Sequence, residues 1–297
     1  MSVLKPTVGL IGTGFMGKPM ARNLLKAGYP VYVHNRTAER MADLIADGAI
    51  APGSPAAVAA KSDVVITMLI DWGTTHEAIY GRNGVMEAIR PGSLFIDMGT
   101  TSPNNARQLE RDFAKKTVEA LDAPVSGGEK GAIEGTLSIM AGGTEKAFGR
   151  AKPIFEAMGK AYVRIGDAGA GQIAKACNQL IVAGTVELVA EAYALARMYG
   201  VDPATVREAI RGGFAGSKIL ELQGQKMLDR NFAPGGPIKT HMKDRANVLD
   251  AIEASGVDLP VARAAFERAK MVVDRGEGDL DHTAMYTLYD DVGAAVR

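Results

Sequence analysis

Short runs of β-branched and apolar residues alternate with amphipathic helical patterns along the first half of the chain. Between the first two runs, apolar residues recur at helical spacing from Met16 to Lys26 and stop at Ala27-Gly28, a common helix end. This alternation is typical of a parallel sheet covered by helices. The predicted strands are Val8 to Ile11, Val31 to His34, Val64 to Leu69, Leu94 to Asp97, Val118 to Leu121, Leu137 to Ala141 and Tyr162 to Ile165.

The second half of the chain has a different pattern. After Gly169 comes one long apolar helix, from Gln172 to about Tyr199, followed only by helical segments. A helix of that length extends roughly 40 Å, enough to leave one domain and support another. Because single cores stop growing at roughly 250 residues, 297 residues suit two domains. We predict an α/β domain over residues 1–166 and an all-α domain over residues 167–297, linked by the long helix.

Composition and charge narrow the class of protein. Lys plus Arg equal Asp plus Glu at 34 each, so no overall field attracts nucleic acid or an anionic membrane. No apolar run approaches the roughly 20 residues of a membrane span without interruption by Gly, Pro or charge. The chain has one cysteine, Cys177, and its start lacks the features of a signal peptide. We therefore expect a cytoplasmic protein.

A glycine-rich turn directly follows the first predicted strand and opens a helix, the context that makes a G-x-G-x-x-G pattern informative. Gly12 permits the tight turn, Gly14 lets backbone N–H groups approach a pyrophosphate, and Gly17 allows close packing of helix on strand. The helix N-terminus adds partial positive charge. The predicted dinucleotide site contains Gly12, Thr13, Gly14, Phe15, Met16 and Gly17, together with Met68 and Leu69 at the end of the third strand.

The end of the second strand indicates which dinucleotide binds. An acidic residue there would bind the ribose 2′-hydroxyl of NAD and repel an additional phosphate. This chain has Asn35, Arg36 and Thr37 instead: the asparagine removes the repulsion, and the guanidinium matches a phosphate. We predict NADP(H) in preference to NAD(H); the alternative is that Arg36 is an ordinary solvated charge.

Two later segments carry candidate chemistry. In Asp122-Ala123-Pro124-Val125-Ser126-Gly127-Gly128 the last three residues can present a hydroxyl and backbone amides to a carboxylate, although a plain glycine turn would look the same. In the long helix, Gln172, Lys175, Asn178 and Gln179 fall on one face. That stripe predicts a helix lining a cleft, where water or ligand satisfies the polar groups, or else a solvated face.

Lys175 is the candidate proton donor. Reduction of a carbonyl needs a hydride from a nicotinamide and a proton delivered to the oxygen as negative charge develops there. An ammonium group supplies both the proton and the positive charge. Lys243, after a Gly/Pro turn in the helical half, is a second cation that could close over the site.

Together these segments resemble the β-hydroxyacid dehydrogenase family over essentially the full chain. GLIGTGFMGKPMARNLLKAG, DAPVSGG, GAGQIAKACNQ and HMKDRANVLD occur in the family's order and at its spacing. The stretches AIRGGFAGSKIL, MLDRNF and DHTAMYTLY are most similar to the branch that reduces tartronate semialdehyde to glycerate. The resemblance implies a six- or seven-stranded Rossmann-like domain, an all-helical second domain, and a homodimer or homotetramer.

The resemblance also implies roles for individual residues. Lys175 corresponds to the catalytic lysine, and Asn178 to the residue that orients the substrate. The family often has a second asparagine where this chain has Gln179, which leaves the role of Gln179 open. The other implied contacts are Ser126, Gly127 and Gly128 with the substrate carboxylate, and Thr100 and Lys243 near the nicotinamide.

Several alternatives remain at this stage. Within the enzyme class they are a 3-hydroxyisobutyrate dehydrogenase or a reductase of glyoxylate or succinic semialdehyde. Imine reductases share the implied architecture but lack the lysine. A different class is a non-catalytic NADP-binding scaffold, against which Lys175, Ser126 and Asn178 argue. We expect no metal, since the four histidines are scattered without ligand spacing.

Overall fold

The computed structural model describes residues 5–235, 237–240, 242 and 256–291. It divides the chain into two compact units, Met1–Lys175 and Ala176–Arg297. The first contains a mostly parallel sheet with helices on both faces, and the described part of the second is helical. The predicted fold class is therefore confirmed.

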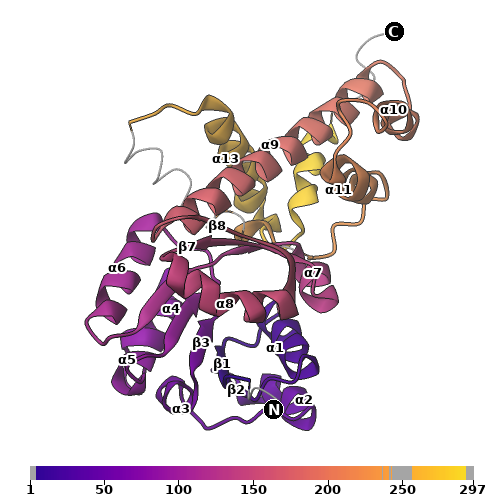
Figure 1. The fold of residues 1–297 in the computed structure, drawn as a ribbon. Helices are drawn as coiled ribbons and strands as arrows, with labels where there is room; N and C mark the ends of the chain where they lie inside the picture. Colours follow the sequence, from indigo (N-terminus) through magenta and orange to yellow (C-terminus); the bar gives the residue numbers. More distant parts are fainter. Residues whose placement is uncertain (1–4, 236, 241, 243–255, 292–297) are drawn as a thin grey trace. The chain divides into compact units, whose positions relative to one another are not determined.

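The sheet of the first unit has eight strands in the order β2-β1-β3-β4-β5-β7-β6, with β8 paired to β7 (Figure 1). Strands β1 to β5 pair in parallel, whereas β7 runs antiparallel to β5 and β6 and parallel to β8. The two-residue strand β6 was not predicted. The strands are β1 (Val8–Ile11), β2 (Val31–His34), β3 (Val64–Thr67), β4 (Leu94–Asp97), β5 (Glu119–Asp122), β6 (Val125–Ser126), β7 (Leu137–Gly142) and β8 (Gly159–Gly166).

The register of the parallel strands brings their carboxyl ends into one row. Ile11 pairs with His34 on one side and with Thr67 on the other; Thr67 pairs with Asp97, and Asp97 with Asp122. The segments that follow these five residues therefore leave the sheet at the same edge. In open parallel sheets this edge is where ligands bind.

Two apolar layers cover the two faces of the sheet. Helices α1 (Gly17–Lys26), α2 (Ala42–Ala46), α7 (Gly128–Glu134) and α8 (Glu145–Met158) contribute buried residues to one layer. Helices α3 (Pro55–Lys61), α4 (Trp72–Tyr80), α5 (Val85–Ala88) and α6 (Pro103–Ala114) contribute to the other. In the second layer the ring of Phe95 stacks on that of Phe113, with centroids 4.1 Å apart. Burial of both faces explains why the strands are continuously apolar rather than alternating.

The described helices of the second unit pack around the far part of α9 (Ala170–Met198). Tyr193 of α9 is fully buried and packs edge-to-face on Tyr286. The other elements are α10 (Pro203–Ile210), α11 (Lys218–Leu228), α13 (Pro260–Val272), a π turn over Val273–Glu277 and a 3-10 helix over His282–Tyr289.

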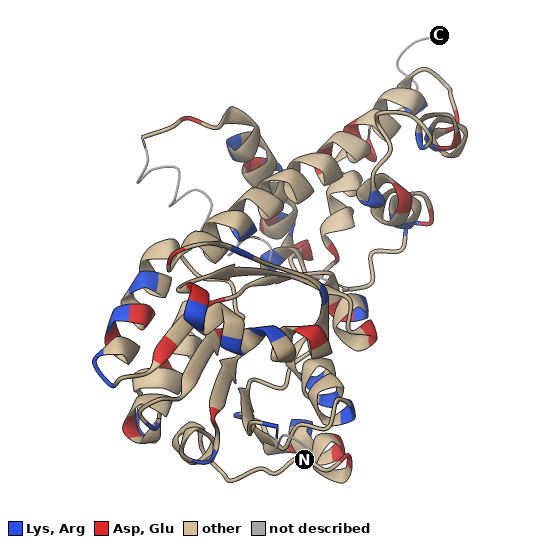
Figure 2. Ribbon diagram, viewed as in Figure 1, with Lys and Arg blue, Asp and Glu red and all other residues tan. Residues whose placement is uncertain are grey.

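The long helix α9 differs from one expectation. Over its 29 residues it is long and apolar enough, by length and composition alone, to cross a membrane, so the expectation that no such run exists was wrong. More than half of its most apolar window is buried within the protein, as in the core helix of a globular fold. Figure 2 shows Lys and Arg interspersed with Asp and Glu along the helices, in agreement with the balanced net charge.

Candidate functional site

The glycine-rich turn leaves β1 at the ligand-binding edge, and its glycines differ in what requires them. Gly12 has φ +103°, and a Cβ there would collide with the main-chain carbonyl oxygen of Met68. A Cβ on Gly17 would collide with the carbonyl oxygen of Gly12, so these two glycines are required by the protein's own packing. A Cβ on Gly14 would meet no atom within 4 Å. The open surface beside Gly14 is where a ligand can approach the backbone.

The start of α1 suits an anion. The N-cap residue, Met16, makes no capping hydrogen bond with its side chain, and the first turn holds no acidic residue, so the helix itself does not neutralise the partial positive charge there. Phe15, in the turn, is 77% exposed, and Met16 is half-buried. Thr13 is buried, and its Oγ1 has no hydrogen-bond partner among the described residues. The turn therefore offers what a dinucleotide pyrophosphate needs: an open glycine, an uncapped helix start and an unsatisfied hydroxyl.

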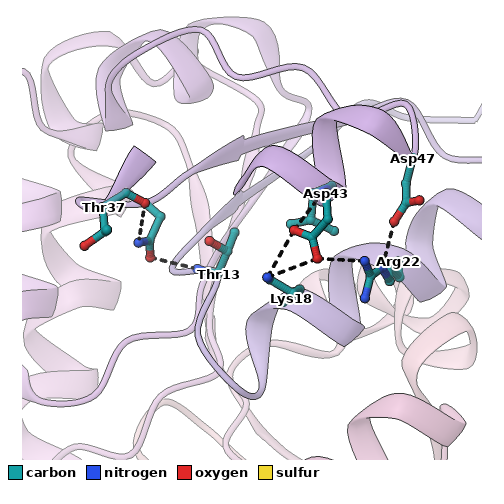
Figure 3. A network of polar contacts seen from close by, with 8 residues as sticks. Thr13, Lys18, Arg22, Thr37, Asp43 and Asp47 are labelled. Carbon is teal, nitrogen blue, oxygen red and sulfur yellow. Dashed lines mark hydrogen bonds and ion pairs between the residues drawn. The ribbon is translucent and has the colours of Figure 1, made fainter. Parts of the chain in front are cut away.

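Asn35 connects this turn to the end of β2. Its Oδ1 accepts a hydrogen bond of 3.1 Å from the Thr13 N–H, and its Nδ2 donates one of 3.0 Å to the carbonyl oxygen of Thr37. Figure 3 shows Thr13 and Thr37 joined through this amide. From the sequence, Asn35 is predicted only to avoid repelling a phosphate. The structure adds that its side chain holds the glycine-rich turn and the Arg36 segment together.

An ion-pair network fixes α1 against α2. Lys18 of α1 lies 3.0 Å from Asp43 of α2, and Arg22 pairs with both Asp43 and Asp47 (Figure 3). The hydrogen bond from Lys18 holds the pKa of Asp43 below its ordinary value. Since the ammonium group of Lys18 is paired with the Asp43 carboxylate, we assign Lys18 to anchoring the helix start rather than to binding a ligand.

Arg36 is exposed, and no hydrogen bond or ion pair joins its guanidinium to any other described residue. Thr37 beside it is also exposed. Arg40, in the 3-10 helix over Ala38–Met41, is a second exposed arginine near this position, and its N–H donates to the carbonyl oxygen of Thr37 at 3.2 Å. Arg40 was not among the predicted residues, although its spacing of four residues from Arg36 was a usable signal.

Lys175 lies close to the predicted substrate loop. It is 8% exposed, and its Nζ donates a hydrogen bond of 2.9 Å to the carbonyl oxygen of Val125. The next residue, Ser126, is half-buried, and the exposed Gly127 and Gly128 have φ of +136° and +62°. These left-handed conformations favour glycine, and both residues are open to solvent. The structure therefore brings Lys175 and the Ser-Gly-Gly loop together.

Asp122 secures the start of α9 from a distant part of the chain. Its carboxylate is 4% exposed and accepts hydrogen bonds from the N–H groups of Gly169, at 2.7 Å, and Gln172, at 2.9 Å. It therefore caps the helix N-terminus as a local Asp or Ser would. Burial raises the pKa of Asp122 to about 6, against the lowering effect of these backbone hydrogen bonds.

Gln172 corrects one part of the predicted polar stripe. It is 2% exposed, and protein groups satisfy its side chain: Oε1 accepts from the Thr101 N–H at 3.0 Å, and Nε2 donates to the carbonyl oxygen of Gly99 at 2.9 Å. Lys175 and Gln179 are also buried, so the solvated-face alternative is excluded for these three residues. The sequence analysis missed the roles of Gln172 and Asp122 because their partners are far away in sequence.

The remaining predicted residues lie as follows. Met68, Leu69 and Thr100 are half-buried on segments that leave β3 and β4 at the ligand-binding edge. Asn178, farther along α9, donates a hydrogen bond of 2.9 Å from its amide to Oε1 of Gln179. Lys243 lies outside the described residues. Within the described ranges, no three His, Cys, Asp or Glu side chains come together in a way that could hold a metal ion.

Comparison with known proteins agrees with this two-part organisation. Residues 7–166 match the family model of the NAD binding domain of 6-phosphogluconate dehydrogenase. Residues 169–289 match the model described as NAD-binding of NADP-dependent 3-hydroxyisobutyrate dehydrogenase. The chain is 41% identical over 279 residues to 2-hydroxy-3-oxopropionate reductase of Escherichia coli, covering 94% of this chain and 95% of that protein. The chain belongs to the β-hydroxyacid dehydrogenase family.

Other members of the β-hydroxyacid dehydrogenase family are nearly as similar. A probable 3-hydroxyisobutyrate dehydrogenase-like protein of Arabidopsis thaliana is 38% identical, covering 94% of this chain and 83% of that protein. The structure of 3-hydroxyisobutyrate dehydrogenase of Mycobacterium tuberculosis with L-serine has a TM-score of 0.87 and 32% identity, covering 95% of this chain and 98% of that one. The chain described here is therefore an NAD(P)-dependent oxidoreductase that acts on hydroxy acids or the corresponding carbonyl compounds.

Proposed function

We propose that this β-hydroxyacid dehydrogenase uses NADPH to reduce the aldehyde of a small semialdehyde acid, converting tartronate semialdehyde to glycerate, with Lys175 as the general acid. The observation that carries the proposal is the 2.9 Å contact between the Lys175 ammonium and the Val125 carbonyl, next to Ser126 and the two glycines. This contact supports Lys175 as a proton donor beside a loop suited to a carboxylate.

The chemistry divides between cofactor and protein. When bound, the nicotinamide supplies a hydride to the aldehyde carbon. Lys175 donates a proton to the aldehyde oxygen as negative charge develops there, and its neutral amine then regains a proton from water. Ser126, Gly127 and Gly128 bind the substrate carboxylate, and Asn178 orients the substrate. The product is the hydroxy acid.

The cofactor preference rests on Arg36. Its exposed guanidinium has no partner among the described residues, and Thr37 and Arg40 lie close to it in sequence. Two guanidinium groups and a hydroxyl suit the 2′-phosphate of NADP better than the 2′-hydroxyl of NAD. We therefore propose NADP(H) as the preferred cofactor. Gly12 to Gly17, Met68, Leu69 and Thr100 contact the rest of it, together with Lys243.

We further propose that residues 1–166 bind the cofactor and residues 167–297 complete the substrate site and form subunit contacts. The proposed enzyme is a cytoplasmic homodimer or homotetramer, with no nucleic-acid or membrane partner.

A second candidate function is oxidation of 3-hydroxyisobutyrate, because relatives named for that activity are 32% and 38% identical to this chain. Reduction of glyoxylate or succinic semialdehyde is a further alternative. The candidate substrates differ in the length and substituents of the carbon skeleton that the pocket must accept.

The test is a substrate panel. NADPH oxidation is followed with tartronate semialdehyde, glyoxylate and succinic semialdehyde, and NADP⁺ reduction with 3-hydroxyisobutyrate, for the wild type and Lys175→Ala. We expect tartronate semialdehyde to give the highest kcat/KM. In Lys175→Ala this kcat/KM should fall about 10²- to 10⁴-fold, the usual contribution of a general acid. A preference for another substrate would replace the proposed one. Equal rates for the two proteins would remove Lys175 from the mechanism.

A further inference from the structure

Gln172 holds the segment around Thr100 from both sides. Its side chain accepts from the Thr101 N–H at 3.0 Å and donates to the Gly99 carbonyl oxygen at 2.9 Å. These two backbone groups flank Thr100. A single buried side chain therefore ties the loop after β4 to the first turn of α9.

Asp122 holds the same turn of α9 from the other direction. Its two carboxylate oxygens bond the N–H groups of Gly169 and Gln172, so the backbone of Gln172 is attached to the end of β5 while its side chain is attached to the loop after β4. We call these two residues, Asp122 and Gln172, the α9 clamp.

The α9 clamp leaves the helix start little freedom to move. A Cβ on Gly171 would lie 2.7 Å from the carbonyl oxygen of Asp122 and 2.8 Å from its Oδ2. A Cβ on Gly142 would lie 2.7 Å from the backbone nitrogen of Gly171. All three distances are shorter than real Cβ contacts, so this packing requires glycine at both positions. The backbone of α9 is in close contact with β5 and β7 at the turn that precedes Lys175.

We propose that Gln172 and Asp122 are positioning residues, which together fix the position of the Lys175 ammonium and the position of Thr100 relative to it. Lys175 follows Gln172 by three residues, within one turn of the same helix, so a shift of the clamped turn moves its Nζ relative to Val125. The inference rests on the proposed function insofar as Lys175 is the proton donor. It adds that Gln172 acts through Lys175 and Thr100 rather than on the substrate.

The first test replaces the side chain that bridges the loop. Gln172→Met has a similar length and removes both hydrogen bonds. Because misplacement of a catalytic group by 1 Å can cost about 10²-fold in rate, we expect kcat to fall about 30- to 100-fold, with KM for NADPH within about twofold of the wild type. Tyr29→Phe is the matched control, because it removes one side-chain hydrogen bond, from the Tyr29 hydroxyl to the carbonyl oxygen of Pro153. Tyr29 lies just before β2, away from the carboxyl ends of the strands. The control should lose stability without loss of kcat.

A second readout does not depend on turnover. Lys175 is modified with trinitrobenzenesulfonate and quantified by peptide mass spectrometry, with the exposed Lys116 as the reference. We expect Gln172→Met and Asp122→Asn to raise the rate of Lys175 modification several-fold over the wild type, and Tyr29→Phe to leave it unchanged. If Gln172→Met does not fold, Asp122→Asn provides the same two measurements.

The outcomes separate the two proposals. A wild type that reduces no aldehyde in the panel defeats the proposed function, and the modification rates still decide the clamp. An active wild type, with clamp variants that keep both kcat and the Lys175 modification rate, overturns the inference. A fall in kcat that only matches the control, with unchanged modification of Lys175, would reduce the clamp to ordinary structural support and also overturn it.

Discussion

The Lys175 ammonium lies 2.9 Å from the carbonyl oxygen of Val125, the residue before Ser126. The contact joins the long helix to strand β6, although the two residues are 50 positions apart. It brings the buried Lys175 next to the residue that precedes Ser126 and two exposed glycines with positive φ. Ser126 should therefore act in substrate binding, and its substitution should affect KM more than kcat.

We predict that Ser126→Ala raises KM for tartronate semialdehyde about 10-fold or more, since a hydrogen bond to a charged group is worth roughly 1.5–3 kcal/mol. KM for NADPH and the thermal midpoint should change little, because the hydroxyl is half-buried and lies at the edge of the sheet. Steady-state kinetics with each substrate varied in turn make the measurement. A KM within twofold of the wild type would remove Ser126 from the carboxylate site.

The exposed guanidinium of Arg36 should determine cofactor choice. We predict that Arg36→Ala raises KM for NADPH about 10-fold or more and leaves KM for NADH within about twofold, because only NADPH carries the 2′-phosphate. Arg82→Ala is the control: Arg82 is also exposed and without a partner among the described residues, but it lies in the turn between α4 and α5. Equal increases in KM for NADPH and NADH would contradict the prediction and leave Arg36 as an ordinary solvated charge.

Asn35 requires a separate variant, because it also holds the turn. Asn35→Asp keeps an acceptor for the Thr13 N–H but replaces the donor that faces the carbonyl oxygen of Thr37 with an oxygen. We predict that Asn35→Asp weakens binding of NADPH more than that of NADH and also lowers the thermal midpoint. Fluorescence titration of both nucleotides, together with thermal unfolding, separates these effects. An unchanged midpoint would show that the Asn35 bridge does not stabilise the turn.

The two roles of glycine in the turn, close packing at Gly17 and open backbone at Gly14, can be separated by alanine substitution. Gly14→Ala should fold with nearly unchanged stability, because its Cβ meets open space, and should bind NADPH at least about 10-fold more weakly, because the backbone can no longer approach the pyrophosphate. Gly17→Ala should lower the thermal midpoint markedly, since its Cβ would collide with the Gly12 carbonyl oxygen. Tight NADPH binding by Gly14→Ala would contradict the assigned pyrophosphate site.

Asp122 should give the folded protein a distinctive pH dependence. Burial raises its pKa from 3.8 to about 6, so between these values the folded state retains a proton that the unfolded state has lost. Its contribution to the free energy of unfolding is therefore full below about pH 4 and falls by up to about 3 kcal/mol as pH rises to 6. The measurement is the difference in unfolding free energy between the wild type and Asp122→Asn, which cancels the other carboxylates. A difference that does not decline over this window would contradict the prediction.

The sequence alone was sufficient for the fold class and for the place of the glycine-rich turn between β1 and α1. Strand positions such as Val31–His34 and Leu94–Asp97 were predicted to the residue, because burial on both faces of a parallel sheet leaves a continuous apolar run. Gly12 and Gly17 were identified because a tight turn between strand and helix restricts residue type locally. Such constraints act within a few residues, so a pattern along the chain records them.

Only the tertiary structure decided which polar groups satisfy one another. The polar stripe predicts that Gln172 faces a cleft, but its side chain bonds Gly99 and Thr101, and the sequence predicts no role for Asp122. The partners of Gln172 and Lys175 in these contacts lie 50 to 73 positions away in the chain. No periodicity or spacing encodes such pairs, because they depend on which strand ends the sheet places next to α9.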